Sequence, residues 1–440
     1  MKVNFSKISH QPTTPLIVRI TKHNWYSFAP LLASLRDSKD LAKKFEIKIA
    51  KTKNTLYQTI KEAKNREDES KNALVLYSFY TTDKEKVEEE VKELREKFGK
   101  NVFLICGGPH PSGDPEDAIN MGFDFIIRGE GEERLKTFLL KILGVENVEN
   151  FPSLQIIPEN FDEKKENLSV DLDDYLPYSI WDNLYPPIEI TRGCPFGCYF
   201  CQTAYLFGRR MRHRSLKSIE VCIEAYKGIF KDRGQVDIRF ISPNALAYGS
   251  DGISPNLEAV EKLLHLCGSK NDTRVFFGTF PSELRPEFVT RKTARLIAEH
   301  ASNKKVHVGG QSGSEDILKK VHRGHDVNSI REAVENLLET GLTPVVDFIF
   351  GFPMETDKDQ IKTLRLIEEI IDQGGEIIVH YFTPLSGTPL YKTKPVDIIK
   401  EVNKIIGRFI KEGKVSGKIH TWKDEREKQT NNNSVFLILI

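Results

Sequence analysis

The chain has 440 residues, more than one hydrophobic core usually serves, so we expect two or three domains. Its 64 basic and 63 acidic residues leave a net charge of +1, and no segment carries the sustained positive field of a non-specific nucleic-acid binder. With no signal-peptide core and no run of about 18 apolar residues, the sequence predicts a cytoplasmic protein with no membrane partner and no indicated nucleic-acid partner.

The first third of the chain alternates short apolar runs with charged amphipathic segments, as the βα units of a parallel sheet do. Residues 83–98 place four apolar side chains at helical spacing, which predicts a helix packed on that sheet. After the last run, the glycines of 128–135 allow a tight turn into another helix. The strand-like runs lie at residues 15–20, 73–78, 101–106 and 123–127.

Residues 146–187 lose this rhythm and are rich in Asn, Pro, Asp and Glu, which predicts an interdomain connector with room for one small hairpin. Six further strand-like runs then follow at regular spacing, separated by amphipathic segments. Six βα units are fewer than the eight of a closed barrel, so we expect an open, partial barrel. These runs lie at residues 187–192, 236–241, 274–279, 306–310, 345–350 and 377–382.

The expected fold class is therefore α/β, with boundaries where the rhythm changes. We predict a parallel-sheet domain over 1–145, a linker over 146–187 and a partial (βα)6 barrel over 188–395. A helical extension and tail are expected over 396–440, and the final run SVFLILI is too short to span a bilayer.

Three of the six cysteines, Cys194, Cys198 and Cys201, lie within eight positions just after the first barrel strand. This is the strand end at which α/β folds carry their chemistry. Thiolates are the usual ligands of iron-sulfur clusters, and three of them leave one of four irons open. A structural zinc site is the alternative, but it needs a fourth ligand, for which His213 is the nearest candidate.

The pattern C-x-x-x-C-x-aromatic-C after a first barrel strand resembles the signature of the radical S-adenosylmethionine (SAM) superfamily. The resemblance implies that Cys194, Cys198 and Cys201 hold a four-iron, four-sulfur cluster whose open iron chelates SAM. An electron then yields methionine and a 5′-deoxyadenosyl radical. It also implies that Phe200 lies against the adenine, although a packing aromatic is the simpler alternative.

Two later turns support this resemblance. The turn after the fourth barrel strand is similar to the SAM-contacting turn of radical SAM methyltransferases, which implies Gln311, Ser312 and Ser314 near the methionine or ribose. A helix-capping role for Ser314 is the alternative. The turn after the fifth strand is similar to the adenine-binding turn, which implies Ile349 and Gly351 beside the base.

The turn after the second barrel strand departs from the superfamily. Its usual Gly-Gly-Glu-like sequence is replaced by ISPNALAYG, in which Ser242 and Asn244 offer oxygens to the SAM amino group. Tyr248 either faces the substrate or belongs to the core. The basic stretch 208–215 either binds an anion or is simply solvated.

The N-terminal segment 73–131 resembles the Rossmann-like cobalamin-binding domain that precedes many radical SAM domains. The resemblance implies that Ser78, Gly107 and Gly108 line the crevice for the cobalamin nucleotide tail. Other cobalamin proteins supply a cobalt-ligating histidine from an Asp-x-His-x-x-Gly loop. Here His23 is present without that Asp and Gly, so we expect cobalamin to bind without a protein histidine.

The remaining cysteines, Cys106, Cys222 and Cys267, and the loop residue His110 are expected to be structural. One cysteine before Cys194 argues against a methylthiotransferase, which carries a second cluster on three N-terminal cysteines, and the C-terminal sequence indicates no RNA-binding barrel.

The sequence thus resembles archaeal-type members of the cobalamin-dependent radical SAM superfamily. The resemblance implies a methyltransferase acting on an unactivated carbon of a small-molecule or peptide substrate, with an external electron donor such as ferredoxin or flavodoxin. Two alternatives stay open: a radical SAM enzyme for cyclisation or rearrangement whose N-terminal domain binds no cobalamin, and a non-enzymatic iron-sulfur sensor or electron carrier.

Overall fold

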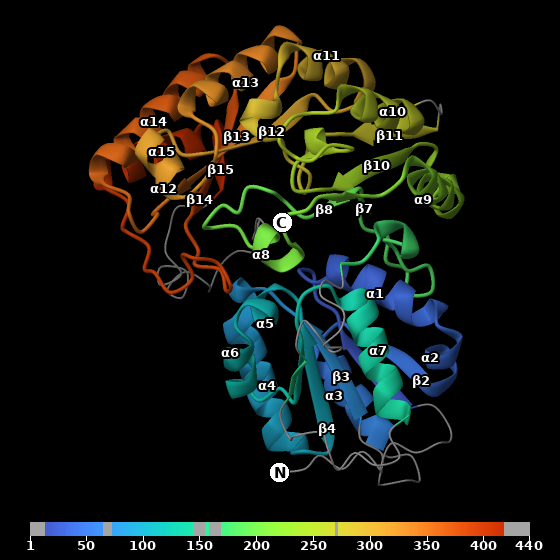
Figure 1. The fold of residues 1–440 in the computed structure, drawn as a ribbon. Coiled ribbons are helices and arrows are strands. Elements are labelled where there is room, and N and C mark those ends of the chain that lie inside the picture. Colours follow the sequence, from blue (N-terminus) through green and yellow to red (C-terminus); the bar gives the residue numbers. More distant parts are fainter. Residues whose placement is uncertain (1–13, 65–72, 145–154, 158–168, 269–271, 418–440) are drawn as a thin grey trace. The chain divides into compact units, whose positions relative to one another are not determined.

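The computed structural model describes every residue except 1–13, 65–72, 145–154, 158–168, 269–271 and 418–440. The chain divides into two units (Figure 1). The first contains Met1–Pro186 and the short segment Leu385–Gly387, and the second contains Pro187–Pro384 and Thr388–Ile440. The predicted boundaries at 145/146, 187/188 and 395/396 remain predictions.

The first unit is built on a six-stranded sheet in which every neighbouring pair is parallel, in the order β2-β1-β3-β4-β5-β6. All four predicted strands are present, and two strands were not predicted. β2 alternates apolar and charged residues at the sheet edge, and β6 lies in the stretch expected to be a linker. The strands are β1 (Thr14–Arg19), β2 (Phe45–Ala50), β3 (Ala73–Ser78), β4 (Val102–Gly107), β5 (Phe125–Ile127) and β6 (Gln155–Ile157).

Helices cover both faces of this sheet (Figure 1). Leu16 packs into the cluster beneath α1 and α7, whereas its neighbour Ile17 packs with residues of α3 and α4 on the other face. Both are fully buried, and burying such a side chain stabilises the fold by about 1.5–3 kcal/mol. The helices are α1 (Trp25–Asp37), α2 (Lys39–Lys44), α3 (Lys53–Lys64), α4 (Lys84–Phe98), α5 (Pro109–Gly113), α6 (Pro115–Asn120) and α7 (Gly131–Gly144), with 3-10 turns η2 (Thr81–Asp83) and η4 (Leu172–Asp174).

The second unit contains all six predicted barrel strands, a further parallel strand, β15, and a short antiparallel hairpin of β8 and β9. β7, β10 and β11 form one parallel sheet, and β12 to β15 form another. The two are joined where His307 donates its backbone N–H to Gly278 at 2.7 Å and where Leu284 bridges Val308. The strands are β7 (Ile188–Glu189), β10 (Val236–Ile241), β11 (Thr273–Phe276), β12 (Lys305–Gln311), β13 (Thr343–Phe350), β14 (Glu376–Tyr381) and β15 (Val415–Gly417), with a β8 (Thr191–Arg192) and β9 (Arg212–His213) hairpin.

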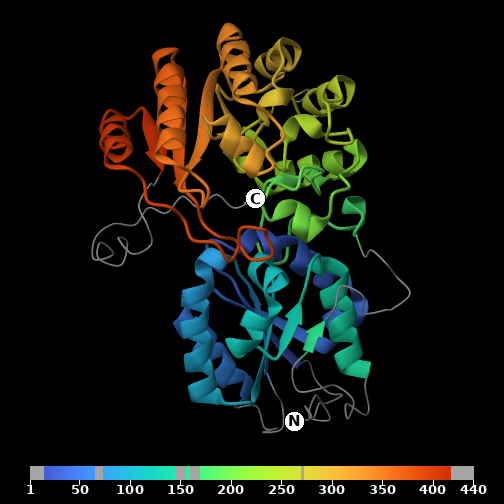
Figure 2. The ribbon, with the colours of Figure 1, turned by 60° about the vertical axis from the view of Figure 1, so that its left-hand side comes forward.

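The helices of the second unit lie along the outer side of its strands, as Figures 1 and 2 show for α13 and α14. A side chain at Gly310 would meet Val346 and Ile330 of α13, so Val346 faces the helices and its neighbour Asp347 faces the opposite side. The helices are α8 (Thr203–Phe207), α9 (Leu216–Ile229), α10 (Leu257–Gly268), α11 (Arg291–His300), α12 (Glu315–Lys320), α13 (Val327–Glu339), α14 (Asp357–Asp372) and α15 (Lys400–Lys411), with η5 (Lys231–Arg233), η6 (Ala245–Ala247) and η7 (Pro286–Phe288).

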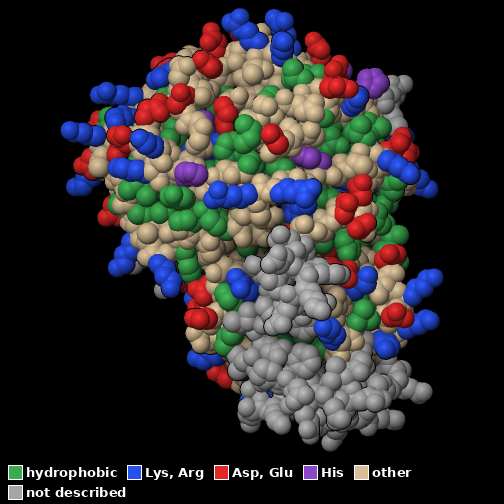
Figure 3. All heavy atoms as spheres, in the orientation of Figure 1, with side chains coloured by type: hydrophobic (Ala, Val, Ile, Leu, Met, Phe, Trp, Pro, Cys, Tyr) green, Lys and Arg blue, Asp and Glu red, His purple; other side chains and the backbone are tan. Residues whose placement is uncertain are grey.

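The C-terminal extension differs in part from the expectation. Helix α15 is present, but it leads into strand β15, which pairs with β14 through Val415 and Ile377. The predicted tail beyond residue 417 lies outside the described residues. Among the described residues, no helix is long and apolar enough to cross a membrane. Figure 3 shows basic and acidic side chains interspersed on the visible face of the second unit.

Candidate functional site

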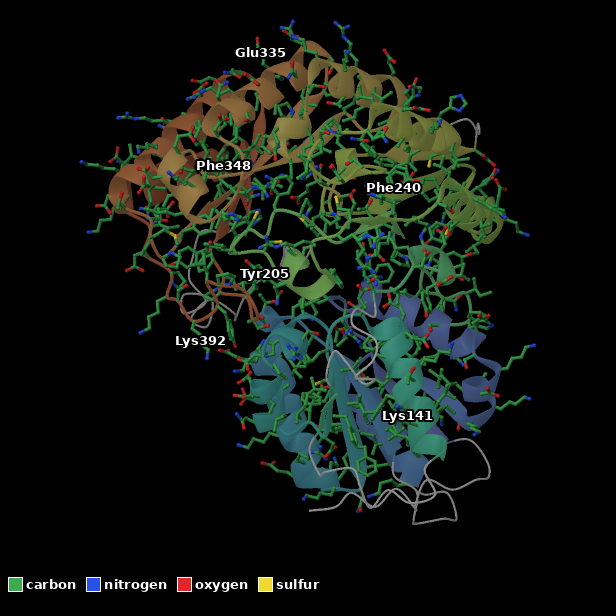
Figure 4. All side chains as sticks on the ribbon, in the orientation of Figure 1. Lys141, Tyr205, Phe240, Glu335, Phe348 and Lys392 are labelled. Carbon is green, nitrogen blue, oxygen red and sulfur yellow. The ribbon has the colours of Figure 1, made fainter. Side chains whose placement is uncertain are left out.

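The three clustered cysteines lie on one loop between β8 and α8, whose Tyr205 is labelled in Figure 4. The β8–β9 hairpin brackets this loop, and the Cys194 N–H donates to the Gly208 carbonyl at 3.1 Å. Gly193 has φ +88°, and a side chain there would collide with the Arg210 carbonyl. The sequence therefore uses glycine where the chain must turn tightly before the first cysteine.

The opposite side of the cysteine loop is anchored to the segment after α12. The Tyr199 N–H donates to the Val321 carbonyl at 3.0 Å, and the His322 ring bonds the Phe196 carbonyl at 3.0 Å. The rings of Tyr199 and His322 stack at 5.4 Å. Two separate parts of the second unit thus hold the loop.

Two guanidinium groups that the sequence reasoning missed point at Cys198. Arg285 and Arg323 each donate an Nη1 hydrogen to the Cys198 sulfur, at 3.9 and 3.8 Å. Arg285 is 3% exposed and stacks over the Phe196 ring at 3.4 Å. No motif marks these arginines in the sequence, because they come from segments 87 and 125 positions away from Cys198.

Burial raises the pKa of the Cys201 thiol to about 11, and the charge of the neighbouring Cys198 is the second-largest cause. Burial also raises the pKa of Cys194. Three thiolates in this loop therefore need a compensating cation, which is what a metal cluster supplies.

His213, the nearest candidate in sequence for the fourth ligand of a zinc site, is engaged in hydrogen bonds within the protein. The Nδ1 of His213 bonds the Thr191 hydroxyl at 3.0 Å, and its Nε2 bonds the Ser250 carbonyl at 2.7 Å. With both ring nitrogens engaged, His213 has no lone pair to offer a metal.

The basic stretch around His213 is structural at its centre. Arg214 is 2% exposed, and its Nε donates to the Glu189 carbonyl at 2.9 Å.

The turn after β12 places Gln311 close to the cysteine loop. Gln311 has φ +70°, a backbone conformation that is uncommon outside glycine and that clusters at functional sites. A side chain at Gly309 would meet both Gln311 Nε2 and Arg323 Nη2, so these two side chains converge there. Gln311 therefore lies beside a guanidinium that also contacts Cys198.

Ser312 and Ser314 are fully buried, and their hydroxyls are used within the protein. Ser314 Oγ donates to Asp359 at 2.6 Å, and Ser312 Oγ lies 3.3 Å from the Thr363 hydroxyl. These bonds tie the turn to α14. Ser314 occupies the N-cap position of α12, but its side chain makes no capping hydrogen bond.

Phe200 and Ile349 pack in one apolar cluster with Phe352. The rings of Phe200 and Phe352 are 5.6 Å apart. Gly351 has φ +89°, and a side chain there would meet the Tyr381 ring. The structure therefore brings together the three residues that the sequence assigns to the adenine.

The turn after β10 is more buried than expected of a ligand-binding turn. Ser242 is 2% exposed, and its hydroxyl lies 2.5 Å from that of Ser282. Asn244 accepts the Arg285 backbone N–H at 3.3 Å, and its side-chain nitrogen is buried without a partner. Tyr248 is 5% exposed and donates to the Arg214 carbonyl, so it belongs to the core.

In the first unit, Ser78 ends β3 and Gly107 ends β4, and these residues are directly paired. Gly108 has φ +89°, and a side chain there would lie 2.5 Å from Ser78 Oγ and 3.1 Å from the Phe79 backbone nitrogen. The three residues assigned to the crevice therefore meet at the carboxyl ends of adjacent strands.

His23 has the carboxylate partner that the loop sequence lacks. Its Nδ1 lies 2.7 Å from Oδ1 of Asp83, which is 60 positions further along the chain. The other ring nitrogen, Nε2, is buried and has no hydrogen-bond partner within the part of the chain that the structure describes. Asp83 therefore orients this imidazole in place of the Asp that the local motif lacks.

The residues expected to be structural are buried. His110 is fully buried, and its Nε2 bonds Asp117 at 2.8 Å while its Nδ1 lies 3.2 Å from the Thr81 hydroxyl. The cysteines outside the loop are also buried: Cys106, Cys222 and Cys267.

Two protein-family models match separate parts of the chain. The B12 binding domain matches residues 42–139, and the Radical SAM superfamily matches residues 188–367. The first match contains Ser78, Gly107 and Gly108 but begins after His23. The second contains the three loop cysteines.

Two curated relatives illustrate the similarity. An uncharacterized methyltransferase of Pyrococcus horikoshii is 25% identical over 317 residues, which cover 69% of this chain and 65% of that protein. A tRNA-2-methylthio-N(6)-dimethylallyladenosine synthase of Thermus thermophilus is 30% identical over 273 residues, covering 60% of this chain and 54% of that protein. The chain therefore spans less than two thirds of the length of either relative.

Solved structures share the fold of both units. The radical SAM methyltransferase TsrM from Kitasatospora setae, with cobalamin and a [4Fe-4S] cluster bound, matches with a TM-score of 0.61 at 15% identity, over 87% of this chain and 77% of that one. The cobalamin-dependent SAM radical enzyme OxsB matches with a TM-score of 0.59 at 15% identity, over 92% and 62%.

Proposed function

We propose that this chain, a cobalamin-dependent radical SAM protein in which a B12-binding domain precedes a radical SAM domain, is a methyltransferase acting on an unactivated carbon. The observation that carries the proposal is the loop 194–201. It gathers three cysteines under two guanidinium groups, while the nearest histidine in sequence, His213, is engaged elsewhere.

The loop fits the four-iron, four-sulfur cluster that a radical SAM domain implies. Cys194, Cys198 and Cys201 supply three thiolates, which leaves one iron for SAM. Arg285 and Arg323 add positive charge at the Cys198 sulfur, which favours reduction of the cluster.

The residues next to the loop fit SAM. Phe200 and Ile349 offer an apolar edge for the adenine, and Gly351 follows Ile349 with the Tyr381 ring packed against its backbone. Gln311 and Arg323 converge over Gly309, where an amide and a guanidinium match the methionine carboxylate. We infer that Ser312, Ser314 and Ser242 shape their turns instead of binding SAM directly, because their hydroxyls contact other side chains.

The first unit fits cobalamin in two respects. Gly108 lets the backbone lie directly against the Ser78 hydroxyl, with no room for a side chain, at the strand ends where a bulky nucleotide tail would approach the backbone. Nε2 of His23, whose other ring nitrogen is held by Asp83, would be the protein atom that binds the cobalt. Cobalamin without a protein histidine stays a prediction from the sequence, and the pairing of His23 with Asp83 leads us to propose ligation through His23 as its alternative.

When bound, the cluster and one SAM would supply a 5′-deoxyadenosyl radical to abstract a substrate hydrogen, and cobalamin, methylated by a second SAM, would supply the methyl group. The protein holds the cluster by three thiolates and holds SAM by the two turns. The electron comes from an external donor such as ferredoxin or flavodoxin, and the substrate is a small molecule or a peptide.

SAM cleavage tests the first part of the proposal. Protein reconstituted with iron and sulfide is expected to release 5′-deoxyadenosine when reduced, and Cys198→Ala is expected to abolish this release. Cys222→Ala is the matched control, because that cysteine is fully buried in α9 and should leave cleavage intact. Equal cleavage by Cys198→Ala and wild type would exclude the cluster assignment.

Cobalamin binding tests the second part. Protein isolated from cells supplied with hydroxocobalamin is expected to show a cobalamin absorption spectrum at one equivalent per chain. If no cobalamin copurifies or binds, the chain is a radical SAM enzyme for another reaction, such as cyclisation or rearrangement, with the first unit as a scaffold.

A further inference from the structure

A second group of metal-ligating side chains lies in the second unit and includes none of the loop cysteines. Glu283 comes from the segment between β11 and β12, His307 from β12 and Asp347 from β13. One ligand atom of each residue lies within 4.8 Å of the other two. Three separate elements of the fold thus bring two carboxylates and one imidazole to a common point.

The strand pairing explains why these side chains meet. β12 and β13 are parallel neighbours, with His307 opposite Val345 and Gly309 opposite Asp347. Val346 faces α13, so Asp347 points away from the helices and toward the face on which Glu283 and His307 join it. This arrangement is set by backbone register, which no local sequence motif reveals.

Two buried polar atoms in this group have no hydrogen-bond partner among the described residues. Asp347 is 1% exposed, and its Oδ2 makes no hydrogen bond, as is also true of the buried Nδ1 of His307. The two atoms face each other at 4.0 Å, which is too far for a hydrogen bond. Buried polar atoms are normally satisfied, so a pair left open across such a gap points to a bound species between them.

The donor set indicates which species this is. Two carboxylates with one imidazole suit a divalent ion such as Zn²⁺, Mn²⁺ or Fe²⁺, whose charge balances the two acids. His380 bonds the other Asp347 oxygen at 3.0 Å and so orients the carboxylate, as the supporting residues of metal sites do. The nearby Arg323 donates hydrogen bonds to the Gly309 carbonyl and to the Cys198 sulfur.

We propose that Glu283, His307 and Asp347 bind one divalent metal ion, separate from the iron of the cysteine loop. Three protein ligands leave at least one coordination position open to water or to an oxygen of the substrate. The site therefore gives the radical SAM domain a second metal, which positions a substrate oxygen.

Manganese binding tests this proposal without relying on SAM cleavage. The holoprotein is used with its cluster assembled and oxidised, so that the loop cysteines are occupied and the Mn²⁺ signal can be read by electron paramagnetic resonance. Wild type is expected to bind one Mn²⁺ per chain, which Zn²⁺ displaces. Asp347→Asn and, independently, Glu283→Gln are expected to weaken Mn²⁺ binding at least tenfold.

Glu376→Gln is the matched control. Glu376 lies on β14 and pairs with Lys305 at a solvent-exposed position, so this variant should bind Mn²⁺ as wild type does. Cluster absorbance verifies that each variant is folded. The proposal is overturned if wild type takes up neither Mn²⁺ nor Zn²⁺, in which case the acids are left to bind an ammonium group of the substrate. It is also overturned if both ligand variants bind Mn²⁺ with wild-type affinity.

Discussion

Arg323 connects the features of the cysteine loop at the scale of single residues. It donates to the Cys198 sulfur and to the Gly309 carbonyl, and it lies beside Gln311. Hydrogen bonds and positive charge at a cluster sulfur favour the reduced cluster. Arg323 is therefore a positioning residue for both the cluster and SAM.

Replacing this arginine should make the cluster harder to reduce. We expect Arg323→Met to lower the midpoint potential by on the order of tens of millivolts, because a positive charge and a hydrogen bond at sulfur are lost. Arg323→Lys keeps the charge and should lower the potential less. A redox titration followed by electron paramagnetic resonance measures this, and an unchanged potential in Arg323→Met would contradict the assigned role.

His23 and Asp83 give a second prediction at this scale. If Nε2 of His23 binds the cobalt, the electron paramagnetic resonance spectrum of bound cob(II)alamin should show nitrogen splitting in wild type. The splitting should be absent in His23→Ala. Asp83→Asn should weaken ligation by roughly 10–100-fold, since losing an orienting partner typically costs this much. His300→Ala, at the last residue of α11 in the other unit, is the control and should keep the splitting. Splitting that persists in His23→Ala would exclude this ligand.

At the scale of secondary structure, the turns at strand ends depend on backbone shape as well as on side chains. Gly108 and Gly99 both have positive φ, at +89° and +61°, but only at Gly108 would a side chain collide with its surroundings. Substituting each glycine in turn therefore distinguishes the cost of backbone strain, which both positions share, from the cost of a steric clash, which arises at Gly108.

Gly108→Ala should therefore cost more than Gly99→Ala. The positive φ costs either variant about 1–3 kcal/mol of folding free energy, and the contact with Ser78 adds to this only at position 108. Chemical denaturation measures the stability difference, and absorption titration with hydroxocobalamin should show weaker binding for Gly108→Ala alone. Equal losses in both variants would show that space beside Ser78 is unimportant.

The turn between β13 and α14 carries a buried acid. Glu355 accepts the Gly351 N–H at 2.6 Å, and α14 then begins with a capping box of Thr356 and Asp359. Burial raises the pKa of Glu355 from its usual 4.5 to about 8. A carboxyl with a higher pKa in the folded state stabilises the fold fully below pH 4.5 and progressively less as the pH rises through 8.

Glu355→Gln should remove this pH dependence, because the amide resembles the protonated acid and can still accept the Gly351 hydrogen bond. Relative to wild type, the variant should gain stability at pH 8.5 and change little at pH 4.5. Denaturant unfolding at the two pH values measures the difference. Glu335→Gln, at the exposed α13 residue labelled in Figure 4, should show no such gain.

At the scale of the whole chain, two units with separate cores lead us to expect two unfolding transitions. Cobalamin at about 100 times its Kd should stabilise the first unit by about 2.7 kcal/mol and raise only the corresponding transition. Differential scanning calorimetry with and without hydroxocobalamin tests this. Equal shifts of both transitions would argue against a site confined to the first unit.

The sequence predicted the architecture where strands are continuously apolar, as in β3 and β13, and where cysteine spacing is diagnostic. It missed β2, whose Glu46 and Lys48 interrupt the apolar pattern at the sheet edge, and the short strands β6 and β15. It also missed Arg285 and Arg323, because contacts across 87 and 125 positions are made by the fold alone. The structure adds the contacts between residues that are distant in the sequence, which local sequence patterns do not predict.

The pairing of His23 with Asp83 also bears on how such proteins are recognised and how they diverge. A search for Asp-x-His-x-x-Gly passes over a chain whose acid arrives from the turn after the third strand. Among homologues, the acid two positions before the histidine and the acid at position 83 should then substitute for one another, so that lineages lacking one retain the other. Covariation between these two distant positions would show that the carboxylate partner of the histidine has moved from one position to the other while the histidine was kept.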